Sequence, residues 1–258
     1  MFLGTFDVLR LKLIACNHDF ILKEIKFHIK EKKNFLISPI ASQTFVLAYY
    51  DKELRDILNK FDYLFSDSLW VKRSVNFLYN IGLKDRLRGS NFLLQVSSLA
   101  QKYRYRVYLY GTTSETLERL KARLFDLYPK IKIVGSAPSV FRPLTPLEKK
   151  NLIKEIEEKK TDILFLALGS PLEQVFSYEI LYRKPSFSKP MIVIPFGAAF
   201  DFISGVKPTA PKWMQEIGIE WFFRLLCEPR RLWKRYLIYG TIFVELVFRQ
   251  KIEVIFKK

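Results

Sequence analysis

The sequence predicts an α/β protein built on a parallel sheet with helices on both faces. Between residues 106 and 197, apolar strands alternate with helical patterns, which is the order of parallel βαβ units. These strands are almost continuously apolar, as expected where helices cover both faces of a sheet. After residue 205 the chain becomes aromatic and basic. We therefore expect a Rossmann-like core over residues 1–205 and a C-terminal helical, basic appendage over residues 206–258.

The composition of the 258 residues fits a folded protein with an anionic partner. Hydrophobic residues make up 49% of the chain, which is enough for a full core. The formal net charge of +17 calls for nucleic acid, acidic lipid or phosphorylated substrates, and charge alone does not choose among them. Two distant cysteines, Cys16 and Cys227, and two histidines argue against a disulfide framework and a histidine-rich metal site. With no signal-peptide pattern and no apolar run of about 20 residues, we expect the protein on the cytoplasmic side.

The first third of the chain is less regular than the middle. Residues 1–34 are expected to form a short strand and an amphipathic helix. A buried strand is expected at Phe35–Ile37, and its pairing should stop at Ser38-Pro39 because proline cannot donate a ladder hydrogen bond. One helix is expected from Thr44 to Leu58, followed by a short strand at Tyr63–Phe65.

An aspartate follows that short strand, in Ser66-Asp67-Ser68. In α/β proteins the carboxyl ends of parallel strands carry the chemistry, so Asp67 is a candidate functional residue. The alternative is that this segment only caps the helix after it.

Two arginines, Arg86 and Arg88, precede Gly89 and a helical pattern from Phe92 to Lys102. Arginines at a helix N-terminus can hold a phosphate group. Solvated surface arginines are the more ordinary explanation, and the spacing alone does not decide between them.

The middle of the chain is the most regular part. Two helices there are expected to begin with capping boxes, Thr112 with Glu115 and Thr145 with Glu148. The later helices should end near Lys159 and Leu181. The expected strands are Val107–Tyr110, Ile131–Val134, Ile163–Ala167 and Met191–Ile194.

Glycines recur where these strands are expected to end, at Gly111, Gly135, Gly169 and Gly197. Ligands of parallel sheets bind in the crevice beyond the strand ends, and glycine lets the backbone approach a phosphate or a sugar. Tight turns also favour glycine, so four such glycines favour a nucleotide-sized ligand only modestly.

Several common site motifs are missing from the sequence. It contains no GxGxxG, no GxxxxGK[ST] and no GxSxG, which argues against an NAD site, a P-loop and a hydrolase nucleophile. It also contains no DxD pair for a divalent cation. If a nucleotide diphosphate leaves here, arginines, lysines and helix N-termini must take up its charge.

The C-terminal segment combines an apolar stripe at helical spacing with positive charge. From Arg224 to Lys258 there are nine Lys or Arg against three Glu, a balance of +6. Such a segment can lie in the interface of an anionic membrane, where each basic residue adds about 1 kcal/mol. A helix packed on the core with a solvated basic edge is the alternative. A nucleic-acid-binding protein that uses this basic surface is a further alternative, but no recognised nucleic-acid motif accompanies the charge, and we expect no nucleic-acid partner.

The chain resembles the WecG/TagA/CpsF glycosyltransferases from about Ser38 to Tyr236. The resemblance rests on several blocks in the right order, not on one motif. These blocks are Arg88-Gly89-Ser90, Gly169-Ser170-Pro171, Gly197–Asp201, Ala210–Gln215, Gly218–Trp221, Arg224-Leu225, Glu228-Pro229 and Arg235-Tyr236.

The resemblance implies a metal-independent, inverting transfer of a sugar from a UDP-sugar to a polyprenyl-diphosphate-linked sugar. The family serves cell-surface polysaccharide biosynthesis, and its best-known reaction adds N-acetylmannosamine to lipid-linked N-acetylglucosamine. It further implies Asp67 as the general base. Ser38, where the family commonly has threonine, is expected in the catalytic site, where it would hydrogen-bond a substrate or position the base. A peripheral protein at the cytoplasmic face of the membrane is implied, with no cofactor and no metal, and homo-oligomerisation is left open.

The strand-end and helix-start patterns and the resemblance together give the expected binding residues. The nucleotide-sugar should contact Gly111, Gly135, Gly169, Ser170, Glu173, Gln174, Gly197 and Asp201. The acceptor diphosphate and the membrane should contact Arg86, Arg88, Arg224, Arg231, Lys234 and Arg235. The segment Trp213–Trp221 is expected to be mainly structural.

The sequence departs from the family pattern around the expected site. Glu173 and Gln174 stand in exchanged order after Gly-x-Pro, and Thr209 replaces an arginine. Ile40, Ser68 and Asn91 replace an asparagine, a glycine and an aspartate. A nucleotide-sugar-binding protein with altered catalysis is therefore the alternative function.

Overall fold

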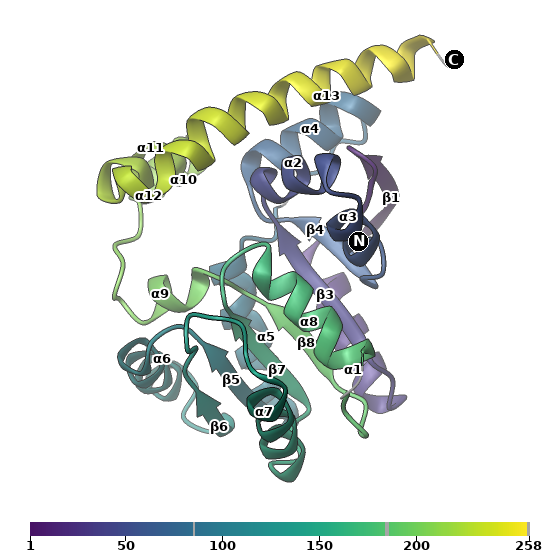
Figure 1. Cartoon of the computed structure of the whole chain (residues 1–258). Helices are drawn as coiled ribbons and strands as arrows, with labels where there is room; N and C mark the ends of the chain where they lie inside the picture. The colour runs from purple at the N-terminus through teal and green to yellow at the C-terminus, as the bar shows by residue number, and fades with distance from the viewer. Residues whose placement is uncertain (85, 184–185, 257–258) are drawn as a thin grey trace.

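The computed structural model describes residues 1–84, 86–183 and 186–256. Its centre is an eight-stranded sheet in the order β1-β2-β4-β3-β8-β7-β5-β6, shown in Figure 1. The strands are β1 (Phe2–Val8), β2 (Leu11–Cys16), β3 (Phe35–Ile40), β4 (Tyr63–Ser66), β5 (Arg106–Gly111), β6 (Lys132–Ala137), β7 (Ile163–Ala167) and β8 (Ile192–Pro195). All neighbouring strands pair in parallel except β1 and β2.

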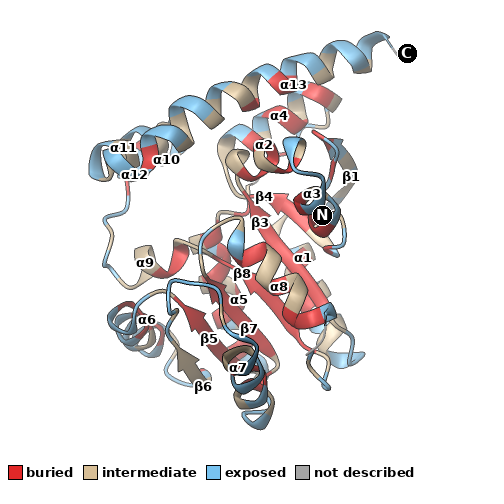
Figure 2. Cartoon of the chain, in the orientation of Figure 1, coloured by how far each residue is buried: buried red, intermediate tan, exposed pale blue. Residues whose placement is uncertain are grey.

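Helices cover both faces of this sheet, as predicted. One apolar core joins the sheet to α2 (Ser42–Tyr50), α3 (Lys52–Leu58), α4 (Leu69–Tyr79), α7 (Pro146–Glu158), α8 (Leu172–Tyr182) and α13 (Tyr239–Phe256). The other core joins it to α1 (His18–Lys30), α5 (Gly89–Tyr103), α6 (Ser114–Leu127) and α9 (Ala199–Ile203). Figure 2 shows the inner strands buried between these two layers, whereas the edge strands β1 and β6 are mostly intermediate or exposed.

The N-terminal segment differs from the prediction, because it contributes two strands in place of one. β1 and β2 form an antiparallel hairpin at the edge of the sheet, so the sheet is mixed. The turn residues Leu9 and Arg10 have φ angles of 49° and 67°, which suit a tight two-residue hairpin turn. Neither residue is a usual turn former, so the sequence carries no turn signal here.

Two further predictions in the first third of the chain were wrong. The helix expected from Thr44 to Leu58 is interrupted at Asp51, whose Oδ1 accepts a hydrogen bond from Leu54 N at 3.0 Å and caps α3. Pro39 does not end β3, because β3 runs on to Ile40 and pairs there with β4. On the other side, pairing with β8 is confined to Phe35 and Leu36, so the missing N–H of proline costs no ladder bond.

Helix starts in the middle of the chain were predicted with mixed success. The capping box of Thr145 with Glu148 is confirmed at the start of α7. For α6 the cap is Thr113 and not Thr112, since Thr113 Oγ1 accepts from Thr116 N at 3.2 Å. Gly135 lies within β6 and not at its end, opposite Tyr108 of β5.

After α9 the chain crosses the carboxyl edge of the sheet and returns over it. It forms α10 (Lys212–Ile217), α11 (Glu220–Cys227), α12 (Pro229–Trp233), the π-helical turn η1 (Lys234–Ile238) and α13. Figure 1 shows α13 lying across α2 and α4, and Phe243 packs on Phe45 with ring centroids 5.9 Å apart. The last two residues of the expected appendage, 257–258, lie outside the described residues.

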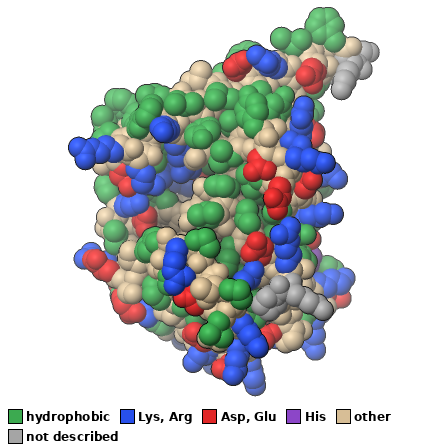
Figure 3. Space-filling view, in the orientation of Figure 1, with side chains coloured by type: hydrophobic (Ala, Val, Ile, Leu, Met, Phe, Trp, Pro, Cys, Tyr) green, Lys and Arg blue, Asp and Glu red, His purple; other side chains and the backbone are tan. Residues whose placement is uncertain are grey.

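The outer surface of this C-terminal segment carries many apolar side chains. Figure 3 shows hydrophobic side chains gathered over α10–α12 and along α13. Within the described part of the chain, no helix is both long and apolar enough to span a bilayer.

Gly111 should be indispensable for stability. A Cβ there would lie 2.2 Å from the carbonyl oxygen of Ala167, and the φ of 117° already disfavours other residues. The clashing carbonyl of Ala167 belongs to the backbone of β7, so it cannot move aside as a side chain could. We therefore expect Gly111→Ala to lower the free energy of unfolding by about 2 kcal/mol or more. Gly240→Ala is the control, since a Cβ at this helical position has nothing within 4 Å. It should leave stability equal or raise it by up to about 1 kcal/mol. Urea unfolding of both variants tests this, and equal losses would contradict the packing argument.

Candidate active site

A cavity of about 820 Å³ lies at the carboxyl edge of the sheet, within the size range of small-molecule sites. Its floor is formed by residues that follow β3, β4, β7 and β8, where parallel-sheet proteins bind ligands. Its roof is formed by α11, η1 and the start of α13. The roof residues include Trp221, Arg224, Arg235, Tyr236 and Gly240.

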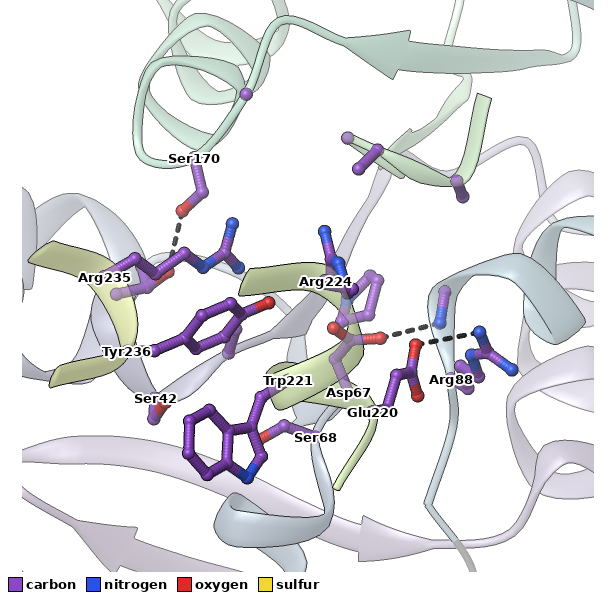
Figure 4. Close-up of a pocket in the computed structure, with 18 of the residues that line it drawn as sticks. Ser42, Asp67, Ser68, Arg88, Ser170, Glu220, Trp221, Arg224, Arg235 and Tyr236 are labelled. Carbon is purple, nitrogen blue, oxygen red and sulfur yellow. Dashed lines mark hydrogen bonds and ion pairs between the residues drawn. The ribbon is translucent and has the colours of Figure 1, made fainter. Parts of the chain in front are cut away.

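Asp67 lies on the floor, immediately after β4. Its backbone N–H donates to Ile40 O at 3.2 Å. Its Oδ1 accepts a hydrogen bond of 2.7 Å from Gly89 N, the first residue of α5, as Figure 4 shows. No hydrogen bond from the described residues reaches the other oxygen, Oδ2. The side chain is therefore oriented by one oxygen and can accept a proton with the other.

Ser38 does not line the cavity. It is fully buried in β3, where its Oγ donates to Pro39 O at 3.0 Å and accepts from Gln174 Nε2 at 3.3 Å. The neighbouring Pro39 lines the cavity instead. Ser38 therefore lies behind the wall, where it can position Gln174.

Glu173 is a buried carboxyl group at the wall formed after β7. It is only 4% exposed, and its Oε2 accepts from Gly169 N at 3.1 Å and Leu168 N at 3.3 Å. Burial raises the pKa of Glu173 to about 7, although the two N–H donors and the charge of Arg235 act in the opposite direction. The carboxylate also requires glycine at 197, because a Cβ there would lie 2.8 Å from Oε1.

A second polar contact joins the two walls of the cavity. Thr44 Oγ1 in α2 and Ser170 Oγ after β7 lie 2.7 Å apart, and either hydroxyl can donate. Both residues line the cavity. Thr44 was not among the predicted site residues, because it stands inside a helix and carries no motif signal.

Two roof arginines point into the cavity, as Figure 4 shows for Arg224 and Arg235. Among the described residues, neither has a carboxylate within ion-pair distance. Arg224 stacks on Phe202 with its Cζ 4.8 Å from the ring centroid, and its Nε has no described hydrogen-bond partner. Burial lowers the pKa of Arg235, and the nearby charges of Arg224 and Arg231 add to this effect. The charge of Asp67 acts on Arg235 in the opposite direction. Two cations without a direct ion-pair partner among the described residues, in a partly buried cavity, favour an anionic ligand.

The other predicted cations either form ion pairs within the chain or lie outside the cavity. Arg88 Nη2 lies 2.8 Å from Glu220 Oε1, and Arg86 Nη2 lies 3.5 Å from Glu220 Oε2. Arg231 forms an ion pair with Glu228. Lys234 is exposed, does not line the cavity and lies over the ring of Trp233.

The predicted nucleotide-sugar residues fall into two groups. The structure brings six of them to the cavity and leaves two outside it. The six are Gly169, Ser170, Glu173, Gln174, Gly197 and Asp201. Outside it, Gly111 packs against the backbone of Ala167, and Gly135 faces Tyr108, whose ring would be 2.5 Å from a Cβ.

Asp201 and Trp221 have surroundings that the sequence did not indicate. Asp201 forms an ion pair of 2.8 Å with Lys207, so its charge is already balanced within the chain. Trp221 was expected to be mainly structural, yet it lines the cavity together with Tyr236, and their ring centroids are 6.0 Å apart. Aromatic residues of an appendage can be assigned to a site only once its packing is known.

No group of three or more His, Cys, Asp or Glu side chains is placed to hold a metal ion within residues 1–84, 86–183 and 186–256.

Stability should depend on pH through Glu173. Its pKa is about 7 in the folded protein, against an ordinary value of 4.5. The folded state therefore holds the proton more tightly than the unfolded state, and this stabilisation is lost as pH rises from about 4.5 through 7. Between pH 5 and pH 8 we expect the wild type to lose up to about 3 kcal/mol relative to Glu173→Gln. Denaturant unfolding of both proteins at the two pH values tests this. Parallel pH profiles would show that the carboxyl group ionises normally.

Comparisons with known proteins found similarity over most of the chain. The Glycosyl transferase WecG/TagA/CpsF family profile matches residues 6–255. A relative from Bacillus subtilis (strain 168) is the N-acetylglucosaminyldiphosphoundecaprenol N-acetyl-beta-D-mannosaminyltransferase. It is 28% identical over 212 residues, which cover 82% of this chain and 78% of the relative. Because the family profile spans nearly the whole chain, from the edge hairpin to α13, this protein belongs to the WecG/TagA/CpsF family of glycosyltransferases.

Proposed function

We propose that this protein transfers N-acetylmannosamine or a related hexose from a UDP-sugar to a polyprenyl-diphosphate-linked sugar in cell-surface polysaccharide biosynthesis. One observation carries the proposal. The cavity combines a carboxylate with a free oxygen, Asp67, and two roof arginines without carboxylate partners among the described residues. A proton acceptor beside an anion site suits transfer between two diphosphate-bearing substrates. The name of the Bacillus subtilis relative supports the kind of sugar and the kind of acceptor.

The proposed reaction is a single displacement. The acceptor hydroxyl oxygen attacks the anomeric carbon of the donor sugar and forms the new C–O bond, while Asp67 Oδ2 takes the hydroxyl proton. The bond from the anomeric carbon to UDP breaks on the opposite face, and its electron pair stays on the UDP oxygen. One displacement inverts the anomeric centre. The positive charge of the cavity would stabilise the leaving diphosphate without a metal.

The binding proposal follows the two sides of the cavity. The UDP-sugar would lie against the loops of Gly169 and Gly197, where small residues let a ligand approach the backbone. The acceptor diphosphate would lie under Arg224 and Arg235, which have no ion-pair partner in the part of the chain that the structure describes. Arg86 and Arg88 are not proposed to bind the diphosphate, because both already form ion pairs with Glu220.

The outer face of the appendage suits a peripheral membrane site. Exposed side chains there include Trp213, Leu226 and Trp233, at 58%, 65% and 43% exposure, beside the cations Arg230 and Lys234. Aromatic and apolar groups among cations favour the interface of an anionic bilayer. We propose that residues 206–258 bring the cavity to the cytoplasmic face of the membrane, where a lipid-linked acceptor is reached.

The alternative is a UDP-sugar-binding protein with altered catalysis. It is favoured by Glu173, which places a carboxyl group where the family has glutamine. An acidic wall residue can repel a diphosphate once it ionises. This alternative predicts UDP binding without transfer.

A panel of UDP-sugars with a polyprenyl-diphosphate-linked sugar tests both functions by UDP release and by the lipid-linked product. With the productive donor we expect Asp67→Asn to lower kcat at least about 100-fold, because the amide still accepts from Gly89 N but takes up no proton. Asp126→Asn, at an exposed position of α6, is the matched control and should keep full activity. UDP binding without product in the wild type would favour the alternative. Near-normal turnover by Asp67→Asn would exclude Asp67 as the base.

Membrane contact can be tested without damaging the core. Residues Phe243, Leu246 and Val247 belong to the core, so truncating the appendage would unfold part of the protein. The double variant Leu226→Ser, Trp233→Ser removes exposed apolar groups only, and should lose most sedimentation with anionic vesicles. Phe125→Ser, on the exposed face of α6, is the control. Equal sedimentation of all three proteins would exclude this face as the membrane contact.

A further inference from the structure

The loop before α5 connects Asp67 to the appendage through alternating residues. Leu87 N donates to Ser66 O at 2.9 Å, and Gly89 N donates to Asp67 Oδ1 at 2.7 Å. Arg86 and Arg88 alternate with these two residues along the chain. Their side chains contact the appendage instead. The same four residues therefore touch the end of β4 on one side and the roof on the other.

A single carboxylate receives both arginines. Glu220, the first residue of α11, is 2.8 Å from Arg88 and 3.5 Å from Arg86. The three side chains are only 11–19% exposed, so this pairing is shielded from solvent. Gln215 of α10 adds two contacts, since its Oε1 accepts from Arg88 and its backbone O accepts from Arg86 at 3.3 Å.

This arrangement has a direct consequence for Asp67. Removing the carboxylate would leave two partly buried guanidinium groups without their counter-charge, and these groups would seek solvent. A shift of the Arg88 backbone that accompanies this movement would displace the adjacent Gly89 N–H, which is the described donor that orients Asp67 (Figure 4). Docking of α11 and orientation of the carboxylate are thus mechanically coupled.

We propose that Glu220 is a positioning residue, which holds the Arg86–Gly89 loop so that Gly89 N–H orients the Asp67 carboxylate. The proposal rests on the proposed function, because it concerns the base of that reaction. It gives the appendage a part in the chemistry that is separate from membrane contact: the base is held in place only while α11 is docked. If Glu220 were only structural, it would stabilise the packing of the appendage on the core without affecting the orientation of the Asp67 carboxylate.

The Gly89 amide supplies a readout that does not depend on activity. It is the first N–H of α5, and such groups have no partner inside their own helix. Its protection from hydrogen exchange therefore reports the bond to Asp67. In the full-length protein we expect Glu220→Gln to speed exchange at Gly89 at least about 10-fold. Glu216→Gln, at an exposed position of neighbouring α10, should leave it unchanged.

Kinetics and a charge exchange complete the test. Glu220→Gln should lower kcat about 10-fold or more while KM for the UDP-sugar changes less than about 2-fold, because binding groups stay in place. The double variant Arg88→Glu, Glu220→Arg should recover the protection of the Gly89 amide from hydrogen exchange, relative to Glu220→Gln. This double variant can be measured even if the single variant folds poorly. Normal Gly89 exchange in Glu220→Gln, or no recovery in the double variant, would overturn the proposal.

The outcomes separate this inference from the proposed function. If the wild type transfers no sugar, the proposed function fails, while Gly89 exchange still decides whether Glu220 orients Asp67. If the wild type is active and Asp67→Asn is not, but Glu220→Gln keeps both its kcat and its Gly89 protection, the function stands and the positioning role is overturned.

Discussion

Parallel pairing of β4, β3, β8 and β7 brings four strand ends to one edge of the sheet, and the cavity floor is built from that edge. Asp67, Gly169 and Gly197 follow three of these strands, so residues up to 130 positions apart become neighbours. Their mutual placement depends on strand register, because a slip would move each of them along the edge. The close fit of Gly111 against the backbone of Ala167 couples β5 to this same set of strands.

The appendage forms the roof of the cavity whose floor lies at the edge of the sheet. Without α11 and η1 the floor would hold carboxyl groups and small residues but few cations, and it would be open to solvent. The roof supplies Arg224, Arg235, Trp221 and Tyr236, and Phe243 of α13 is part of the main core. The segment that contacts the membrane in our proposal is therefore also structural, and its Glu220 forms an ion pair with Arg88 in the loop whose Gly89 N–H donates to Asp67.

Charge in the cavity is divided into paired and unpaired groups. Arg231 and Asp201 are balanced by partners within the chain, so they contribute mainly to shape. Arg86 and Arg88 share the single carboxylate of Glu220, so one net positive charge remains in that group. Arg224 and Arg235 have no ion-pair partner among the described residues, and in our proposal they bind the acceptor diphosphate. Glu173 is kept largely neutral below pH 7 by burial, which limits its repulsion of that ligand. The cationic character of the site thus comes from a small part of the large net charge.

The sequence by itself determined the α/β class, the strands and helices of its regular middle, the family, and Asp67 at a strand end. These follow from local patterns: apolar runs, caps such as Thr145, and motif blocks that are continuous in the chain. Only the tertiary structure decided that β1 and β2 form a hairpin with an unusual turn, that Ser38 lies behind the wall, and that Thr44 and Trp221 line the cavity. It also decided which arginines form ion pairs among the described residues, because a pair such as Arg88 with Glu220 joins residues 132 positions apart, and no local pattern carries that information.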